Sequence, residues 1–123
     1  AFTGIIKNTL DKLHNLGSDV NDITAVIGPC IKKKNYEVKI DFYNKFIIQN
    51  KKNESFFEKI NDEKYFFNLR AFINVKISEQ SVKNIENIEM DTFSDSESFY
   101  SYRRARANKE KDYGRCISVI LMT

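Results

Sequence analysis

Histidine and cysteine are scarce in this sequence, which excludes two kinds of small protein. Two cysteines and one histidine among 123 residues are too few for a disulfide framework or for a self-contained zinc site of cysteine and histidine ligands. No apolar run is long enough to cross a membrane, and the first residues, Ala1 to Thr3, show no signal-peptide pattern. We therefore expect a cytoplasmic protein without a membrane partner.

The sequence has no large excess of positive or negative charge. The 20 basic and 17 acidic residues give a net charge of +3, which by itself does not indicate a nucleic-acid partner. Hydrophobic residues make up 41% of the chain, and 10 phenylalanines and 6 tyrosines can supply an aromatic core. At this length, the composition is typical of one globular domain or of part of one.

Helical and extended patterns alternate along the chain. Apolar residues at three- and four-residue spacing predict helices over residues 1–16, around 42–50 and over 69–77, the last capped by Asn68. Short apolar runs predict strands at Ile23–Ile27, Glu63–Phe67, Val82–Met90 and Ile117–Met122. This order of elements indicates an α/β fold.

The first helix and the first strand carry two further expectations. The helix has one apolar face, ends at Gly17 and starts at residue 1 without a cap, which suggests that something upstream is missing. Its apolar positions are Phe2, Ile5, Ile6, Leu10, Leu13 and Leu16. The strand Ile23–Ile27 is continuously apolar except for Thr24, and we expect it to be buried on both faces.

Cys30 follows the first predicted strand. Gly28 and Pro29 break the strand and present Cys30 at its carboxyl end, where α/β proteins tend to place ligand sites. A nucleophilic cysteine needs a base, and the only histidine, His14, lies on a helix face, so we expect a buried or site-lining thiol. The basic run Lys32–Lys34 fits either phosphate or nucleic-acid binding, or a solvated loop.

A second candidate site is the stretch Ser98–Arg104, in which three aromatic residues lead into two arginines. Arginine binds phosphate or carboxylate through two parallel hydrogen bonds, and aromatic rings give a flat apolar wall, so one interpretation is a nucleotide-like or phosphate ligand. In the other interpretation the aromatic residues belong to the core and the arginines pair with Asp91, Asp95 or Glu97.

A series of motifs resembles one protein family. The series is Ile27–Ile31, Asn35–Val38, Lys64–Arg70, Phe99–Arg104 and Gly114–Arg115, in this order. It is similar to the laccase-domain family, also called multicopper polyphenol oxidase-like proteins. The resemblance implies a layered αββα sandwich with mixed sheets. It also implies zinc-dependent phosphorolysis of purine nucleosides (adenosine, inosine and methylthioadenosine), with accompanying adenosine deaminase activity.

The resemblance covers only part of the family domain. Family members hold zinc with two histidines and one cysteine, in motifs resembling Q-V-H-G, A-D-C and H-A-G-W-[RK]-G, and none of these motifs occurs here. Neither Cys30 nor His14 matches a ligand position. The resemblance therefore implies that residues 1–123 are the C-terminal part of a single domain and are inactive alone. The implied partners are a purine nucleoside, phosphate and the missing N-terminal half.

The chain also departs from the family pattern at several positions. Asn68 stands where aspartate is usual, Lys39 where glycine often follows the Tyr-Glu-Val motif, and Asp91-Thr92 where Cys-Thr is common. These departures leave the order of the motifs intact.

The resemblance assigns provisional roles to three residues. Cys30 is expected to line the pocket, and Arg103 and Arg104 either assist anion binding or brace the loop that frames it. Two alternatives remain: a catalytically silent half-domain, and a nucleic-acid-binding module that uses the nearby tyrosines for stacking. Acidic residues interleaved with the arginines argue against the second, namely Asp95, Glu97, Glu110 and Asp112.

Overall fold

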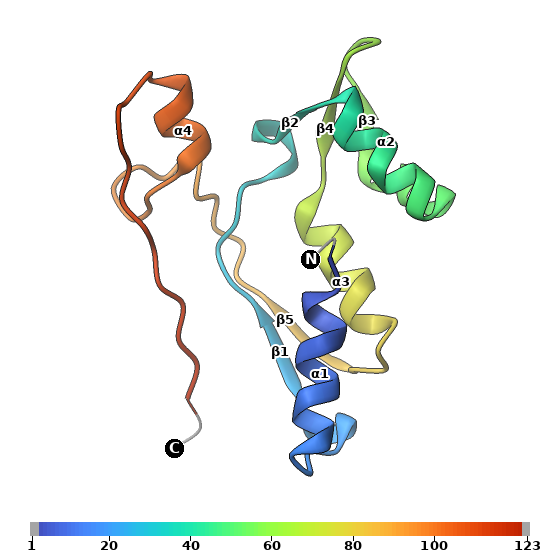
Figure 1. Ribbon diagram of the computed structural model, residues 1–123. Helices are drawn as coiled ribbons and strands as arrows, with labels where there is room; N and C mark the ends of the chain where they lie inside the picture. The colour runs from blue at the N-terminus through green and yellow to red at the C-terminus, as the bar shows by residue number, and fades with distance from the viewer. Residues whose placement is uncertain (1–2, 122–123) are drawn as a thin grey trace.

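Two small sheets, one parallel and one antiparallel, organise the chain (Figure 1). The structure is a computed structural model that describes residues 3–121. Helices and strands alternate through most of the sequence, which confirms the predicted α/β class. Every helix within residues 3–121 is too short or too polar to span a lipid bilayer.

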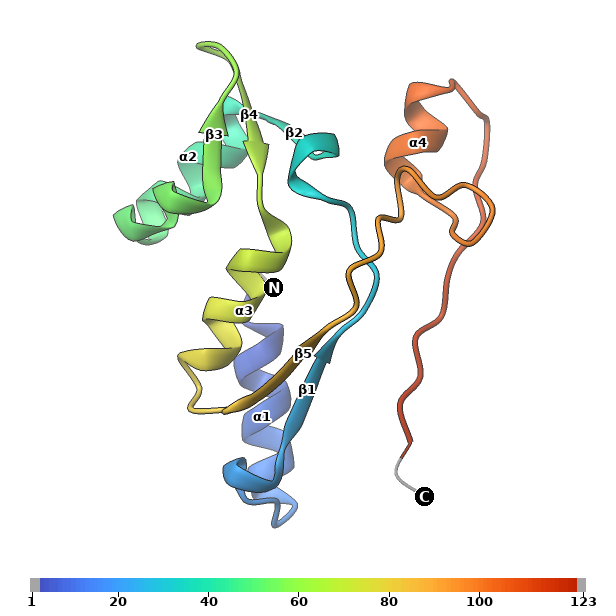
Figure 2. The same ribbon diagram turned by 180° about the vertical axis from the view of Figure 1, so that it is seen from behind.

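The parallel sheet consists of β1 (Thr24–Ile27) and β5 (Asn84–Asn87), paired in register from Thr24 opposite Asn84 to Ile27 opposite Asn87. Helices α1 (Ile5–Asn15) and α3 (Leu69–Ser78) lie on the same side of this sheet in both views (Figure 2). The buried residues between them are Ile27, Ile77 and Val82, against which Ile6, Leu10 and Ile23 pack.

Only one face of β1 is covered. Ile27 is buried, whereas Thr24 and Val26 are exposed. The prediction that this strand is buried on both faces is therefore wrong, because in the described part of the chain both neighbouring helices pack on the same side. The predicted strand Val82–Met90 is confirmed only over Asn84–Asn87.

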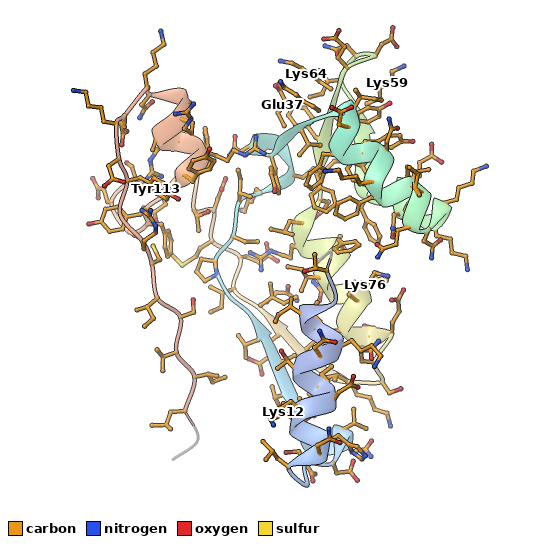
Figure 3. All side chains as sticks on the ribbon, in the orientation of Figure 1. Lys12, Glu37, Lys59, Lys64, Lys76 and Tyr113 are labelled. Carbon is orange, nitrogen blue, oxygen red and sulfur yellow. The ribbon has the colours of Figure 1, made fainter. Side chains whose placement is uncertain are left out.

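The antiparallel sheet has the strand order β2 (Glu37–Lys39), β4 (Lys64–Phe67), β3 (Phe57–Lys59). An ion pair of 2.8 Å between Lys64 and Glu37 joins β4 to β2 at the surface (Figure 3). The sequence predicted β4 but missed β2 and β3, because a run of three residues is too short to show a period of two.

Helix α2 (Ile40–Gln49) packs on this sheet and completes an aromatic core. The Phe46 ring lies 5.0 Å from the rings of both Phe67 and Phe72, measured between centroids. All three rings are at most 4% exposed, so each contributes about 1.5–3 kcal/mol of hydrophobic stabilisation. Phe56 and Phe57 pack against the same core, as the sequence predicted.

Helix α3 connects the two cores. Phe72 belongs to the aromatic core, Ile77 to the core under the parallel sheet, and Ile73 packs against both. The helix begins after Asn68, whose side chain accepts a hydrogen bond of 3.1 Å from the Ala71 amide, which confirms the predicted cap. One well-capped helix therefore holds both sheets in a fixed relation.

The start of α1 differs from the prediction. The helix begins at Ile5 rather than at residue 1, after Gly4 in the left-handed conformation (φ 87°) and without a side-chain cap. Its end is as predicted, with Gly17 left-handed at φ 97°. Phe2, placed on the apolar face by the sequence, lies outside the described residues.

Within residues 3–121 the larger elements are connected by three 3₁₀ helices, η1 (Val20–Asp22), η2 (Lys33–Asn35) and η3 (Lys51–Phe56). The predicted loop after α2 is therefore η3. Its buried Asn53 donates a hydrogen bond of 2.9 Å to the Phe46 carbonyl, which satisfies a polar group at the end of α2.

The C-terminal segment contains a short helix that the sequence did not predict, α4 (Tyr102–Ala107), capped by Ser101. The Tyr113 ring then packs beside it, 5.2 Å from the Tyr102 ring (Figure 3). The predicted strand Ile117–Met122 is wrong for residues 117–121, which pair with no described strand, and Met122 lies outside the described residues. Without a neighbouring strand these side chains stay exposed, 88% for Ile117.

Candidate functional site

The chain segments that follow β1 and β5 stay together beyond the sheet. The Ile88 amide donates to the Ile27 carbonyl at 2.9 Å, the Cys30 amide to the Met90 carbonyl at 3.3 Å, and the Thr92 amide to the Cys30 carbonyl at 3.4 Å. Cys30 is thus fixed at the carboxyl ends of the parallel strands, the position from which the sequence proposed a ligand site.

The Cys30 thiol is suited to lining a site rather than to attacking a substrate. Partial burial raises its pKa, an effect that the nearby Arg70 opposes and that Asp91 and Glu89 reinforce. The thiol is therefore neutral near pH 7 and a weak nucleophile. The only histidine, His14, lies on α1 and lines depressions with Ser18 and Val20.

Asp91 holds the loops of this region in place. It is 8% exposed, and its carboxylate accepts hydrogen bonds from the Lys32 and Phe93 amides and from the side chains of Asn35 and Ser94, at 2.6 to 3.2 Å. Burial raises the Asp91 pKa, but these hydrogen bonds to the ionised form outweigh it, and the net pKa is lowered. The ionised carboxylate therefore ties the segment after β1 to the segment after β5.

Arg104 braces the loop that precedes α4. Its Nη1 donates to the Thr92 carbonyl at 2.8 Å and to the Phe93 carbonyl at 3.0 Å, and its Nη2 donates to the Phe99 carbonyl. The Arg104 guanidinium is thus hydrogen-bonded to both ends of the 92–99 loop. Both terminal nitrogens of this guanidinium therefore donate to the protein backbone.

Arg103 holds the same region to the antiparallel sheet. Its Nη1 donates to the Glu37 carbonyl at 2.8 Å, and its guanidinium lies 4.9 Å from the centre of the Tyr36 ring. It borders a depression of about 270 Å³. The lining residues are Ile31, Tyr36, Leu69, Thr92, Tyr100, Ser101, Tyr102 and Arg103.

The expected arginine–carboxylate pairs do not form as direct contacts. Within residues 3–121 neither Arg103 nor Arg104 has an ion pair with Asp91, Asp95 or Glu97. Hydrogen bonds from Ser98 lower the pKa of Asp95, and the charge of Arg104 contributes to the same shift. Both arginines bind backbone carbonyls instead. Arg104 binds those of Thr92, Phe93 and Phe99 in the 92–99 loop, and Arg103 binds that of Glu37 in β2. Every residue has a backbone carbonyl, so the residue pattern does not show which carbonyls an arginine binds. The sequence could therefore predict that an arginine braces the loop but could not identify the acceptors.

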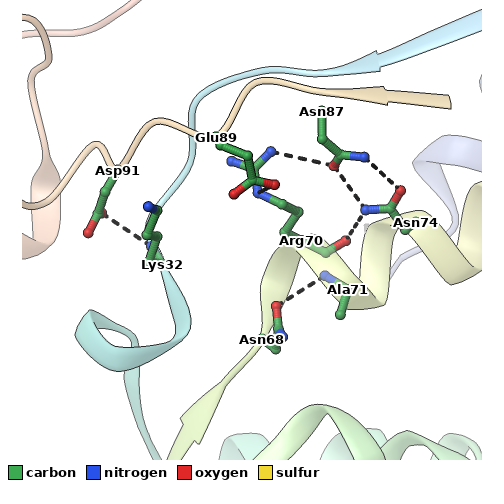
Figure 4. A network of polar contacts seen from close by, with 8 residues as sticks. All are labelled: Lys32, Asn68, Arg70, Ala71, Asn74, Asn87, Glu89 and Asp91. Carbon is green, nitrogen blue, oxygen red and sulfur yellow. Dashed lines mark hydrogen bonds and ion pairs between the residues drawn. The ribbon is translucent and has the colours of Figure 1, made fainter.

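A second and larger depression, of about 600 Å³, lies between the loop after β1, the start of α3 and the segment at the end of β5 (Figure 4). Its lining includes Lys32, Lys33, Lys34, Asn68, Arg70, Asn74, Asn87 and Glu89. Cys30 is not among the lining residues of either depression, whereas its neighbour Ile31 lines both.

Arg70 is the central side chain of this larger depression. Its Nη1 donates to the Asn87 side chain at 3.4 Å, and its Nε lies 3.9 Å from the Glu89 carboxylate. Asn87 and Asn74 also exchange two side-chain hydrogen bonds, of 3.0 and 3.1 Å, which join β5 to α3 (Figure 4). Arg70 was not among the site residues predicted from the sequence. The available signal was its place in the first turn of a helix after a capping asparagine.

The described residues do not provide a metal site. No group of three or more histidine, cysteine, aspartate or glutamate side chains within residues 3–121 is placed to hold a metal ion. The candidate soft donors come from separate places, His14 on α1, Cys30 after β1 and Cys116 in the C-terminal segment. The donors of this chain therefore do not fit the zinc site that the resemblance implies.

Comparisons with known proteins agree on one family. A family model described as "Multi-copper polyphenol oxidoreductase laccase" matches residues 1–123. A protein of Rickettsia conorii named purine nucleoside phosphorylase is 33% identical over 99% of this chain, and a protein of the same name from Rickettsia prowazekii is 35% identical over 85% of it. The crystal structure of the hypothetical protein YfiH of Bacillus licheniformis superimposes on 85% of the chain with a TM-score of 0.76 and 27% identity.

The match covers only part of each relative. The chain spans 50% of the Rickettsia conorii protein, 43% of the Rickettsia prowazekii protein and 41% of the Bacillus licheniformis chain. Residues 1–123 thus correspond to about half of the proteins they resemble.

Proposed function

The chain belongs to the multi-copper polyphenol oxidoreductase laccase family, and we propose that it is the C-terminal part of a single domain that acts as a purine nucleoside phosphorylase. The observation that carries this proposal is the name shared by the two Rickettsia relatives, which are 33% and 35% identical. Because the chain spans about half of their length, the activity is proposed for the completed domain and not for these residues alone.

The proposed reaction is a displacement at the sugar. A phosphate oxygen forms a bond to C1′ of the ribose while the bond from C1′ to the purine nitrogen breaks. The purine leaves with the bonding electron pair and takes up a proton, and the sugar is released as its 1-phosphate. Such a site has to hold phosphate beside the nucleoside and exclude water, which would otherwise compete as the attacking group.

Within this chain, the proposed site roles follow from the contacts. Arg104 braces the 92–99 loop, which its bonds to three carbonyls support. Arg103 borders the smaller depression together with Tyr100 and Tyr102, whose rings offer an apolar wall for a nucleoside. Cys30 contributes a neutral thiol at the ends of the parallel strands.

Zinc enters the proposal only through the completed domain. The resemblance implies two histidine ligands and one cysteine ligand, and the donors in this chain do not fit that set. We propose that the ligands lie outside residues 1–123, in the N-terminal half of the domain. The completed domain is further proposed to be cytoplasmic and to deaminate adenosine.

A pair of chimeras tests the proposal. In one, the half of the Rickettsia conorii protein that this chain does not match is fused before Ala1, and in the other the same half is fused after Thr123. Each chimera and the 123-residue chain are incubated with inosine or adenosine and phosphate, free purine is measured, and bound zinc is determined. We expect turnover and stoichiometric zinc from the first chimera, and neither from the chain alone.

Each result bears on a separate part of the proposal. Turnover by the chain alone would contradict the partial-domain assignment. Turnover only by the second chimera would place residues 1–123 in the N-terminal half. A first chimera that unfolds cooperatively but releases no purine would contradict the proposed activity.

A further inference from the structure

The larger depression gathers positive charge on a chain that is otherwise nearly balanced. Four cationic side chains, Lys32, Lys33, Lys34 and Arg70, line it together with one carboxylate, Glu89. The whole chain carries only three more basic than acidic residues. The lining of this one depression therefore accounts for as large an excess of positive charge as the entire chain, which favours an anionic ligand.

Arg70 is the most informative of these cations because it is largely buried and weakly paired. Its side chain is 13% exposed, and its contacts with Asn87 and Glu89 are long, 3.4 and 3.9 Å. The neutral Cys30 thiol also lies beside it and supplies no negative charge. Its buried Nη2 has no hydrogen-bond partner among the described residues. A guanidinium bound to a carboxylate or phosphate normally sits at about 2.7–2.9 Å. A buried cation without a close anion is unfavourable, so this arrangement leaves room for one.

Glu89 occupies the position that such an anion would take. Its side chain is 71% exposed and lies beside the Arg70 guanidinium at the edge of the depression (Figure 4). An exposed glutamate held at 3.9 Å gains little from the pairing and can turn into solvent at small cost. The Arg70 Nε donor then becomes available to a ligand, beside the Nη2 group that has no partner among the described residues.

The lysine run is held in place rather than floating in solvent. The Lys32 amide donates to Asp91, and η2 (Lys33–Asn35) closes with a hydrogen bond of 2.9 Å from the Asn35 amide to the Lys32 carbonyl. Lys33 pairs with Glu58 at 2.5 Å. Within residues 3–121 the side chains of Lys32 and Lys34 have no ion pair, so two ammonium groups at the rim remain available.

The start of α3 adds a favourable field. Asn68, Arg70 and Ala71 all line the depression, and they are the capping residue and first turn of a helix of 10 residues. The amide dipoles at a helix start favour negative charge within the first turn. This field supports the side chains and does not replace them.

We propose that the larger depression binds inorganic phosphate, with Arg70 as the two-donor ligand, Lys32 and Lys34 supplying charge, and Glu89 as a competing carboxylate that the phosphate displaces. The inference rests on the proposed function for the role of the anion as the co-substrate. Binding itself requires only this chain. Of the interpretations of the Lys32–Lys34 run, namely phosphate binding, nucleic-acid binding and a solvated loop, the proposal adopts the first.

The test is a calorimetric titration of the 123-residue chain with inorganic phosphate at low ionic strength and pH 7.5. We expect saturable binding that Arg70→Gln weakens about tenfold or more, because charge-assisted hydrogen bonds are lost. Arg106→Gln is the matched control. Arg106 is exposed on α4, so this substitution removes the same charge at a position away from the depression. It should leave the affinity within about twofold.

Glu89→Gln provides a result of opposite sign. Removing the competing carboxylate should tighten phosphate binding several-fold, and a merely structural role for Glu89 would not produce that gain. This variant also keeps the proposal testable if Arg70→Gln does not fold, because Glu89 is mostly exposed. Absence of saturable binding, equal weakening by Arg70→Gln and Arg106→Gln, or unchanged or weaker binding by Glu89→Gln would each overturn the inference.

The chimeras separate this inference from the proposed function. Purine release by the first chimera, with no phosphate binding by the chain, would overturn the phosphate site alone. Phosphate binding with the expected variant effects, in a folded but inactive chimera, would overturn the proposed activity alone.

Discussion

Replacing Arg104 by lysine should destabilise the chain although the charge is kept. The guanidinium holds three carbonyls, those of Thr92, Phe93 and Phe99, from two separate nitrogens. A lysine ammonium has all its donors on one nitrogen and cannot span the same acceptors, so we expect two of the three hydrogen bonds to be lost. Hydrogen bonds to charged groups contribute about 1.5–3 kcal/mol each.

Arg104 is only partly buried, so water replaces some of the lost interaction, and we expect a loss of about 2–4 kcal/mol in the free energy of unfolding. That is a large part of the stability of a small domain, about 5–15 kcal/mol. The assay is urea unfolding of the 123-residue chain followed by circular dichroism. Arg106→Lys is the matched control, an exposed arginine two positions along the same helix, and should change the free energy by less than about 0.5 kcal/mol.

Hydrogen exchange locates the effect. Amides of the 92–99 loop should exchange faster in Arg104→Lys, while amides of α2 and β4 should change only as far as global stability changes. Equal unfolding free energies for Arg104→Lys and Arg106→Lys would refute the bracing role. So would a stability loss without faster exchange in the loop.

Two further predictions follow from close packing and from a lowered pKa. Gly114→Ala should destabilise the C-terminal segment by about 0.5–1.5 kcal/mol, seen as faster proteolysis there, because a Cβ at this position would lie 2.5 Å from the Tyr100 ring and turn that exposed side chain away from its rotamer. Gly28→Ala, whose Cβ would meet its nearest atom only at 4.0 Å, should leave proteolysis unchanged, and equal rates for the two variants would contradict the packing argument. Because the pKa of Asp91 is lowered by folding, its contribution to stability is complete above the unfolded value of about 3.9 and is lost as pH falls from there through the folded value. Asp91→Asn should therefore flatten the loss of stability below about pH 4 relative to the exposed control Asp22→Asn, and an unchanged acid slope would contradict this role.

The sequence determined the elements whose signal is local. The three long helices, the Asn68 cap and the Gly17 end follow from apolar spacing and from the hydrogen-bonding and conformational preferences of single residues. The order of the family motifs also identified the family, because that order needs no knowledge of distance in space. The position of Cys30 at the end of a strand could also be predicted from local sequence, because Gly28 and Pro29 end the apolar run just before it.

Only the tertiary structure decided which residues meet. Arg104 and the three carbonyls it binds are close in sequence, but backbone acceptors have no residue signature. Arg70, Lys32 and Glu89 belong to segments far apart in the chain, and the depression they line exists because β1 and β5 pair in parallel and continue side by side. The predicted last strand fails for a related reason. Apolar residues with strand propensity become a strand only beside another edge, and within residues 3–121 the segment 117–121 has none.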